Sequence, residues 1–240
     1  MSKRRIKKMF KQVRDANLKY RLVENGDRVA VGLSCGKDSI TLLYFLCLLQ
    51  KYTPLDFEII PIHIDLGWNL ELNSLTEFCQ SLGLPLKIEK TNIGQVVFEI
   101  RKEDNPCSLC ANLRRGALNN TAKNMDCNKV ALGHHMDDVV NTLFLSMLYE
   151  NRFGVFKPLT YLDRVDITVI RPLIYVEEKD IELFIESSDI AVVENLCPAE
   201  GLSKRKEISL LVDKIEIEHP GAKRSFLRSI ENVSPNNFWK

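Results

Sequence analysis

Short apolar runs alternate with stretches of helical periodicity along most of the chain. Runs rich in β-branched residues predict strands at residues 28–34, 57–65, 85–90, 129–132 and 166–172. Elsewhere, apolar residues recur at every third or fourth position, which predicts helices at residues 37–51, 70–82, 109–125, 137–149 and 177–187. Because strands that alternate with helices are joined by right-handed crossovers, we expect an α/β fold with a parallel sheet flanked by helices.

The two ends of the chain depart from this alternation. Residues 1–21 carry nine Lys or Arg and one acidic residue, and the spacing of Ile6, Met9 and Val13 predicts a basic amphipathic helix. From residue 203 onward the chain is again expected to be helical and carries several basic residues. The sequence therefore predicts three parts: a basic N-terminal helix (1–25), a central domain (26–190) and a C-terminal segment (191–240).

The composition is that of an ordinary globular protein. The chain has 240 residues, of which 45% are hydrophobic and 27% charged, and its formal net charge is +1. Only a local charge bias can therefore indicate a partner. The longest apolar run has eight residues, whereas a membrane helix needs about 20. Since no apolar signal core follows the basic start, we expect a cytoplasmic protein without a membrane partner.

A polar loop stands between the first predicted strand and the first predicted helix. It consists of Ser34, Cys35, Gly36, Lys37, Asp38 and Ser39. Backbone N–H groups and the positive end of the helix dipole can hold a nucleotide phosphate there, with Lys37 as a point charge. Asp38 suits a metal ion that accompanies the phosphate. The Cβ of Cys35 predicts a backbone that avoids the left-handed region and a thiol beside the phosphates.

This loop is not the P-loop of kinases, because the GxxxxGK[ST] spacing is absent. It resembles the SGGKDS loop of the PP-loop ATP pyrophosphatases, which are similar in fold to other adenine nucleotide α-hydrolases. Five of the six positions match, and Cys35 stands where that family has glycine. The resemblance implies that ATP is cleaved between its α and β phosphates and that AMP is transferred to a substrate oxygen.

Three cysteines are spaced for a metal centre. Cys107 and Cys110 form a CxxC pair, which we expect in a turn that lets two thiolates converge. The chain has no second CxxC, and Cys197, followed by Pro198 in an expected loop, is the third candidate. The spacing leaves four interpretations open: a [4Fe–4S] cluster with one iron lacking a protein ligand, zinc with a fourth ligand, thiols that carry a persulfide, or an accidental pair.

Four separate motifs narrow these interpretations by resemblance. CSLCANLRRG (residues 107–116), GHHMDD (133–138), IRPL (170–173) and NLC (195–197) follow one another in the order found in the tRNA 2-thiocytidine synthetases, which thiolate cytidine 32 of tRNA. The resemblance covers about residues 25–235. It implies that Cys107, Cys110 and Cys197 ligate a [4Fe–4S] cluster whose free iron carries the sulfur.

The GHHMDD motif follows the fourth predicted strand, at the same sheet edge as the polar loop. Gly133 and His134 are candidates for nucleotide contact, and His135 is expected to be a half-buried structural residue. Asp137 and Asp138 fall in the first turn of a helix, where carboxylates suit the helix dipole. One of them is alternatively expected to bind Mg²⁺ on the pyrophosphate.

Two further residues end predicted strands. Asp65 is placed to meet the adenosine, with His63 as a second candidate, whereas Arg171 is expected either to reach a phosphate or, more simply, to form a surface ion pair. Arg114 and Arg115 follow the CxxC pair closely and are candidates to guide RNA to it.

The basic first helix could neutralise RNA phosphates through residues such as Lys7 and Lys8, or pack on the domain or on a second subunit. We therefore expect a tRNA sulfurtransferase that uses ATP, Mg²⁺ and a [4Fe–4S] cluster, with Asp38 and the three cysteines as catalytic residues. The expected partners are tRNA and a sulfur donor such as a cysteine desulfurase, and a homodimer stays open. The alternatives are a related thiolase of another nucleoside or non-tRNA substrate, a persulfide carrier, or a non-catalytic RNA-binding homologue.

Overall fold

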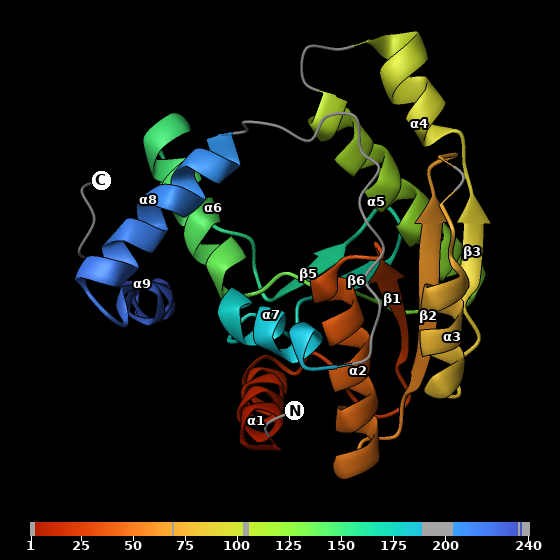
Figure 1. Cartoon of the computed structure of the whole chain (residues 1–240), viewed down its shortest axis with the longest axis horizontal. Helices are drawn as coiled ribbons and strands as arrows, with labels where there is room; N and C mark the ends of the chain where they lie inside the picture. Colours follow the sequence, from red (N-terminus) through yellow and green to blue (C-terminus); the bar gives the residue numbers. More distant parts are fainter. Residues whose placement is uncertain (1–2, 69, 103–105, 189–203, 235, 237–240) are drawn as a thin grey trace.

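The computed structural model describes residues 3–68, 70–102, 106–188, 204–234 and 236. Within these residues one six-stranded sheet has the order β3-β2-β1-β4-β6-β5. Its strands are β1 (Arg28–Leu33), β2 (Glu58–Asp65), β3 (Lys87–Lys90), β4 (Lys129–Ala131), β5 (Leu159–Leu162) and β6 (Ile167–Ile170). Neighbouring strands are parallel except for β5, which pairs antiparallel with β6 at one edge. The α/β fold with a mostly parallel sheet confirms the sequence prediction (Figure 1).

Helices surround this sheet. They are α1 (Lys3–Tyr20), α2 (Lys37–Tyr52), α3 (Asn73–Ser81), α4 (Ile93–Gln95), α5 (Pro106–Asn124), α6 (Met136–Tyr149), α7 (Glu178–Glu186), α8 (Lys204–Glu218) and α9 (Ala222–Glu231). A π-helical segment (Val96–Arg101) continues α4. Among the described helices none is long and apolar enough to cross a membrane.

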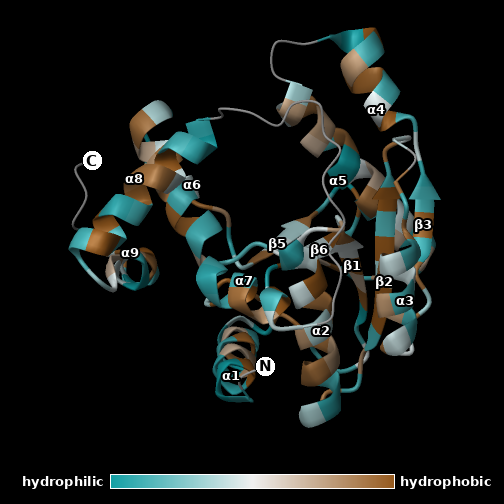
Figure 2. Ribbon diagram, viewed as in Figure 1, coloured by the Kyte–Doolittle hydropathy of each residue, from teal (hydrophilic) through white to brown (hydrophobic). Residues whose placement is uncertain are grey.

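Two hydrophobic cores hold the layers together, one on each face of the sheet. The larger core joins β1 to α2, α3 and α7 through residues such as Val31, Leu42 and Phe184, and Met9 of α1 belongs to it. The second core packs α5 on the opposite face through residues such as Leu118. Because both faces are covered, the central strands are apolar almost throughout, as parallel strands require. Figure 2 shows this hydrophobic colouring along β2 and α2, whereas α1 is mostly hydrophilic.

The carboxyl ends of the central strands meet at one edge. Val31 of β1 pairs with Pro61 of β2 on one side and with Ala131 of β4 on the other. Ala131 in turn pairs with Ile170 of β6. The segments that follow β1, β2, β4 and β6 therefore start side by side, which is where parallel α/β sheets bind ligands.

The ends of the chain pack onto this body. α1 contacts α2 and α7, and α8 and α9 contact α6 and each other. Val140, Ile208 and Val212 form a small third core between α6 and α8. The helices after residue 203 confirm the sequence prediction, but the division into parts at residues 25 and 190 stays a prediction.

Three elements differ from the sequence prediction, and one of them is α4 with its π-helical continuation, where no element was predicted. β5 is an edge strand that the sequence pattern did not indicate. Its four residues directly follow Pro158 and are at most partly buried, so apolar and polar residues do not alternate clearly along it. α5 begins at Pro106 rather than at residue 109, since proline is favoured at the first position of a helix. The CxxC pair consequently lies in the first turn of α5 and not in a turn before it.

Candidate active site at the carboxyl edge of the sheet

The polar loop connects β1 to α2, as the sequence predicted. Gly36 has an extended backbone, and α2 begins at Lys37. The Ser39 hydroxyl fixes the loop, since it accepts a hydrogen bond from the Ser34 N–H at 3.1 Å and donates one to the Gly36 carbonyl at 2.9 Å. The chain after β4 touches this loop closely. A Cβ built on Gly133 would lie 3.0 Å from the Asp38 carbonyl oxygen, so Gly133 permits the close approach of the two backbones.

The backbone conformation of Cys35 differs from the sequence prediction. Its φ is +67°, which is the left-handed conformation that the sequence analysis expected this residue to avoid. The turn needs a positive φ here, and the cysteine takes the place of the glycine that would adopt it without strain. The expected place of its thiol beside a phosphate stays a prediction. The thiol is buried in the larger core, and its Sγ lies 3.6 Å from Nδ1 of His63. Burial raises the pKa of Cys35 to about 11, so the thiol is inert packing.

Lys37 is held by a carboxylate from α7. Its Nζ lies 2.7 Å from Oε1 of Glu178 and 4.0 Å from Oε1 of Glu182. Burial alone would lower the pKa of Lys37, but the hydrogen bond to Glu178 and the neighbouring carboxylates raise it above its ordinary value. The Lys37 ammonium therefore stays positively charged at the start of α2.

Asp38 and His135 meet beside Lys37. Oδ1 of Asp38 is buried and has no hydrogen-bond partner among the described residues. Nε2 of His135 lies 3.8 Å from this oxygen and 3.5 Å from Oδ2 of Asp138. His135 is fully buried, not half-buried as expected. Burial would lower the pKa of His135, but Asp137, Asp138 and Asp38 together raise it. Burial is also the main reason that the pKa of Asp38 is raised.

Asp137 uses both carboxylate oxygens to join other elements. Oδ2 accepts the backbone N–H of Glu178 at 2.7 Å, and Oδ1 accepts a hydrogen bond from Nζ of Lys223 at 2.6 Å. Although burial would raise the pKa of Asp137, the bonds with His135, Lys223 and the Glu178 N–H hold it well below its ordinary value. This arrangement favours the structural interpretation of Asp137 over a magnesium ligand. Sequence reasoning missed Lys223, because nothing in the chain links α9 to this turn.

Asp138 accepts the backbone N–H of His135 at 3.2 Å, so it caps the helix that it begins. In the part of the chain that the structure describes, no three His, Cys, Asp or Glu side chains form a group that could hold a metal ion. The carboxylate that best fits a cation is Asp38, because its buried Oδ1 lacks a hydrogen bond and lies at the phosphate loop. Mg²⁺ usually takes one or two carboxylates and completes its shell with phosphate oxygens and water.

The CxxC pair lies at the same edge of the sheet. α5 connects β3 to β4 and runs against the strand direction, so its first turn stands at the carboxyl ends of the strands. Cys107 is exposed and Cys110 is buried, and residues three apart on a helix are neighbours. The helix dipole favours negative charge at this turn, which suits thiolate ligands. The described cysteines form no disulfide, and ligation of a cluster by the pair stays a prediction. Cys197 lies outside the described residues.

The two arginines that follow the pair differ in their surroundings. Arg114 lies close enough to Cys35 and His63 for its charge to act on both. Arg115 is exposed, and its guanidinium donates to the Ala111 carbonyl at 3.1 Å. Asp65 accepts the Gly67 N–H at 2.8 Å and so fixes the turn after β2. Its contact with adenosine stays a prediction.

Three planar side chains lie together: His134 after β4, Phe156 before β5 and Arg171 after β6. The His134 ring packs on Phe156 with 4.9 Å between the ring centroids, and the Arg171 guanidinium lies 4.9 Å from the centre of the same Phe156 ring. Nη1 of Arg171 donates to the Lys157 carbonyl at 2.6 Å. Burial lowers the pKa of His134 to about 4 and that of Arg171 to about 10, with smaller effects of nearby charges. Among the described residues Arg171 forms no surface ion pair, because its partner is a backbone carbonyl, and its contact with a phosphate stays a prediction.

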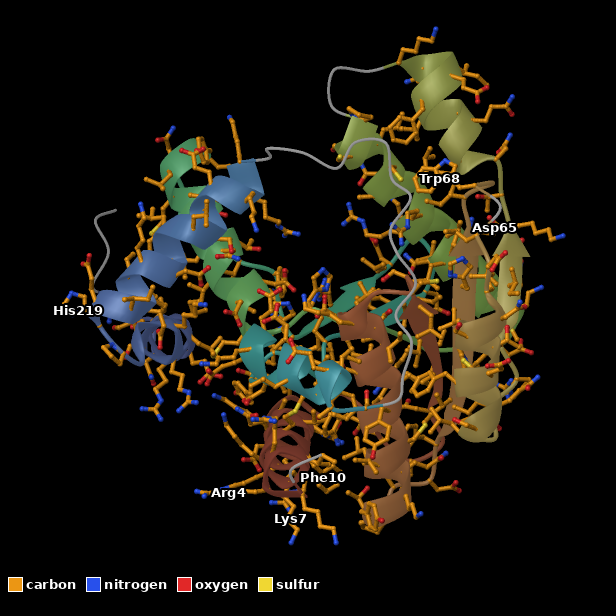
Figure 3. All side chains as sticks on the ribbon, viewed as in Figure 1. Arg4, Lys7, Phe10, Asp65, Trp68 and His219 are labelled. Carbon is orange, nitrogen blue, oxygen red and sulfur yellow. The ribbon has the colours of Figure 1, made fainter. Side chains whose placement is uncertain are left out.

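The basic first helix packs against α7. Nζ of Lys8 lies 2.6 Å from Asp180 and 4.0 Å from Glu177, so its charge is compensated within the chain. Lys7 is exposed and points away from the carboxyl ends of the strands (Figure 3). Contact of either residue with RNA stays a prediction.

Comparisons with known proteins agree with this geometry. The model of the PP-loop domain family matches residues 1–208. The tRNA-cytidine(32) 2-sulfurtransferase of Geotalea uraniireducens (strain Rf4) is 40% identical over 220 residues, which are 90% of this chain and 87% of that protein. The chain belongs to this PP-loop sulfurtransferase family. A second member, from Deinococcus radiodurans, is 38% identical over 232 residues, which cover 95% of this chain and 78% of that protein. These matches confirm the family and the enzyme class that the sequence predicted.

Solved structures extend the comparison of this sulfurtransferase. The U34-tRNA thiolase NcsA from Methanococcus maripaludis, solved with its [4Fe–4S] cluster, superposes with a TM-score of 0.79 at 29% identity, over 96% of this chain and 80% of that one. An NH3-dependent NAD synthetase from Campylobacter jejuni superposes with a TM-score of 0.52 at 13% identity, over 98% and 97% of the two chains, which shows only that the fold is shared.

Proposed function

We propose that this chain thiolates cytidine in tRNA, at position 32 of the anticodon loop, with ATP as the activating substrate and a [4Fe–4S] cluster as the sulfur-carrying group. The observation that carries the proposal is one of placement. The phosphate loop after β1 and the CxxC turn of α5 open onto the same carboxyl edge of the sheet. The identity to tRNA-cytidine(32) 2-sulfurtransferases supports cytidine as the target base.

In the first half-reaction the loop binds the phosphates of ATP. The N–H groups at the start of α2 and the Lys37 ammonium neutralise the phosphate charge, and Asp38 would hold the accompanying Mg²⁺ with its unpartnered oxygen. The C2 oxygen of cytosine attacks the α-phosphorus, the bond to the β-phosphate breaks, and pyrophosphate leaves. Positive charge prearranged at this point lowers the barrier, because charge builds on the leaving group.

In the second half-reaction sulfur replaces the activated oxygen. The cluster, when bound by Cys107, Cys110 and Cys197, would supply the sulfur from its iron without a protein ligand. Sulfur bonds to C2, and the bond from C2 to the adenylated oxygen breaks, so AMP leaves with that oxygen. Because C2 of cytosine is a poor electrophile, the ATP is spent to make the oxygen a good leaving group. The chain holds the base and excludes water while this exchange occurs.

The test combines turnover with nucleoside analysis. Anaerobically purified protein with ATP, tRNA and a sulfide source is expected to release pyrophosphate and to form 2-thiocytidine, detected by mass spectrometry of the digested tRNA. Lys37→Ala should lose pyrophosphate release and keep its iron, whereas Cys107→Ala, Cys110→Ala and Cys197→Ala should each lose the iron and thiolation but still bind ATP. Zinc in place of iron, or thiolation retained in any one cysteine variant, would contradict the cluster. Thiouridine as the product would contradict cytidine.

A further inference from the structure

A cavity separate from the phosphate loop lies between the two terminal helices. The end of α1, the first half of α6, the segments next to β5 and β6, and the last turns of α9 line a volume of about 300 Å³. In Figure 1 α1 and α9 lie at the lower left, whereas α5 begins near the top. The volume equals that of about ten water molecules in the liquid and reaches the lower end of the range for ligand sites in proteins.

The floor of this cavity is apolar. Val139, Ile174 and Leu227 line it, and each is at most 8% exposed. The other apolar residues of the lining are Val155, Phe156, Pro158 and Ile230. Because water in an apolar cavity finds too few hydrogen-bond partners, such a space is better filled by an apolar group.

Charged side chains surround the mouth of the cavity. Lys19 and Lys157 line it and are exposed. Glu231 also lines it, and its Oε1 lies 2.8 Å from Nζ of Lys19 and accepts hydrogen bonds from the hydroxyls of Tyr20 and Tyr175. The carboxylate is thus neutralised and bonded within the chain. Two lysines and one glutamate leave a net charge of +1 at the mouth, carried by Lys157.

An apolar floor and a positive mouth fit a molecule with an apolar body and a single negative charge. Burial of the body is favourable, and the charged group can meet Lys157 while it keeps part of its hydration. A polyanion such as a nucleotide does not fit, because the floor offers it no polar partner. A cation is disfavoured by the net charge of the mouth.

Phe156 connects this cavity with the candidate active site. Its ring lines the cavity and also packs on the His134 ring, with 4.9 Å between the centroids. The guanidinium of Arg171 lies 4.9 Å from the centre of the Phe156 ring. His134 directly follows Gly133, whose backbone rests against that of Asp38. A molecule in the cavity would therefore contact the ring on which His134 and Arg171 are packed.

We propose that this cavity is a second ligand site, which binds a small apolar monocarboxylate. The apolar body lies on Val139, Ile174 and Leu227, and the carboxylate meets Lys157 at the mouth. Occupation holds the Phe156 ring in place, and with it His134. The site goes beyond the proposed function and does not depend on it, since binding there needs neither ATP nor RNA.

The test uses octanoate as the probe, because its size of about ten non-hydrogen atoms matches the cavity volume. It is titrated into the full chain, with labelled Val, Leu and Ile methyl groups, and followed by proton–carbon correlation NMR. The methyl signals of Val139, Ile174 and Leu227 are expected to shift in a saturable way, with a Kd on the order of 1 mM or lower. The ring signals of His134 should shift with the same Kd, whereas Val97, in the second core, should not respond.

Variants and analogues test the two parts of the site separately. Ile230→Trp fills the cavity and should weaken binding at least about tenfold. Lys157→Gln should weaken it about threefold, and octanol should bind the wild type more weakly than octanoate by a similar factor. Lys51→Gln is the matched control, because Lys51 is an exposed lysine of α2 that does not line the cavity, and it should bind octanoate like the wild type.

Three results would overturn the inference. The first is the absence of a saturable shift of the three methyl signals up to about 20 mM octanoate. The second is wild-type affinity in Ile230→Trp or in Lys157→Gln, and the latter change is at an exposed position that needs no repacking. The third is binding of octanol or octylammonium as tight as that of octanoate. The proposed function is judged separately, by 2-thiocytidine formation.

Discussion

Nζ of Lys223 lies 2.6 Å from Oδ1 of Asp137, which ties the start of α9 to the start of α6 across 86 positions of the chain. Lys223 also bonds Asp213 of α8 at 2.7 Å. The other oxygen of Asp137 accepts the first N–H of α7. One carboxylate thus joins three helices beside the loop after β1, so the loss of its partners should destabilise the packing of all three.

Lys223→Met should strongly destabilise the protein. The side chain of Asp137 is only 6% exposed, so the variant leaves a buried carboxylate without its cation, which costs about 3 kcal/mol. The measurement is the free energy of unfolding in urea. Lys123→Met is the matched control, because Lys123 makes an ion pair of similar length, 2.7 Å, at an exposed position and should change the stability by less than about 1 kcal/mol. Equal losses in both variants would contradict the assigned role of Asp137.

His135 should make the stability depend on pH near neutrality. Its pKa is raised in the folded state by Asp137, Asp138 and Asp38, so its contribution is fully present below the unfolded value of about 6.5 and is lost as the pH rises through the folded value. The wild type should therefore lose stability as the pH rises above about 6.5. His135→Asn should be less stable at pH 6 and should show a flatter profile. Parallel profiles of the two proteins in urea unfolding would rule out this contribution.

Glu178→Gln should strengthen ATP binding. Glu178 bonds Lys37 at 2.7 Å, and phosphate oxygens compete with this carboxylate for the ammonium. Removing a partly exposed pair of this kind is worth up to about 1 kcal/mol, so the Kd for ATP should fall by up to about fivefold in isothermal titration. Glu182→Gln is the control, since that carboxylate lies 4.0 Å away and should change the Kd less. Weaker binding in Glu178→Gln would show that the carboxylate assists the nucleotide.

Cys35→Gly should be tolerated. Glycine adopts a φ of +67° without strain, which offsets most of the lost burial of the small thiol, so the stability should change by less than about 1 kcal/mol. Cys35→Val should be worse, because a β-branched side chain is strongly disfavoured at positive φ. Thermal unfolding and the Kd for ATP check both variants. A large loss in Cys35→Gly would mean that the thiol does more than fill space.

The sequence was most informative where local pattern and chemistry coincide. β1, the phosphate loop and α2 form one continuous strand–loop–helix unit, and each part has a signal within a few residues. The CxxC pair is equally local, although Pro106 started the helix earlier than periodicity alone indicated. These features could be predicted because they need no knowledge of distant contacts.

Contacts between distant segments could not be predicted in this way. Lys223 meets Asp137, and Phe156 meets both His134 and Arg171, only after the chain has folded. The conformation of Cys35 was predicted wrongly because a side-chain argument was applied to a turn whose geometry is imposed by the loop. In each case the arrangement depends on contacts between segments that are distant in the sequence, and a local sequence pattern carries no information about such contacts.

Gly133 fixes how closely the chain after β4 approaches the loop after β1. With only a hydrogen in place of a Cβ, the strand exit after β4 rests directly against the backbone of Asp38, so any larger residue would push that wall outward. A side chain at position 133 therefore cannot be accommodated unless the start of α2 moves. A search for altered specificity at this edge of the sheet therefore begins at residues other than Gly133.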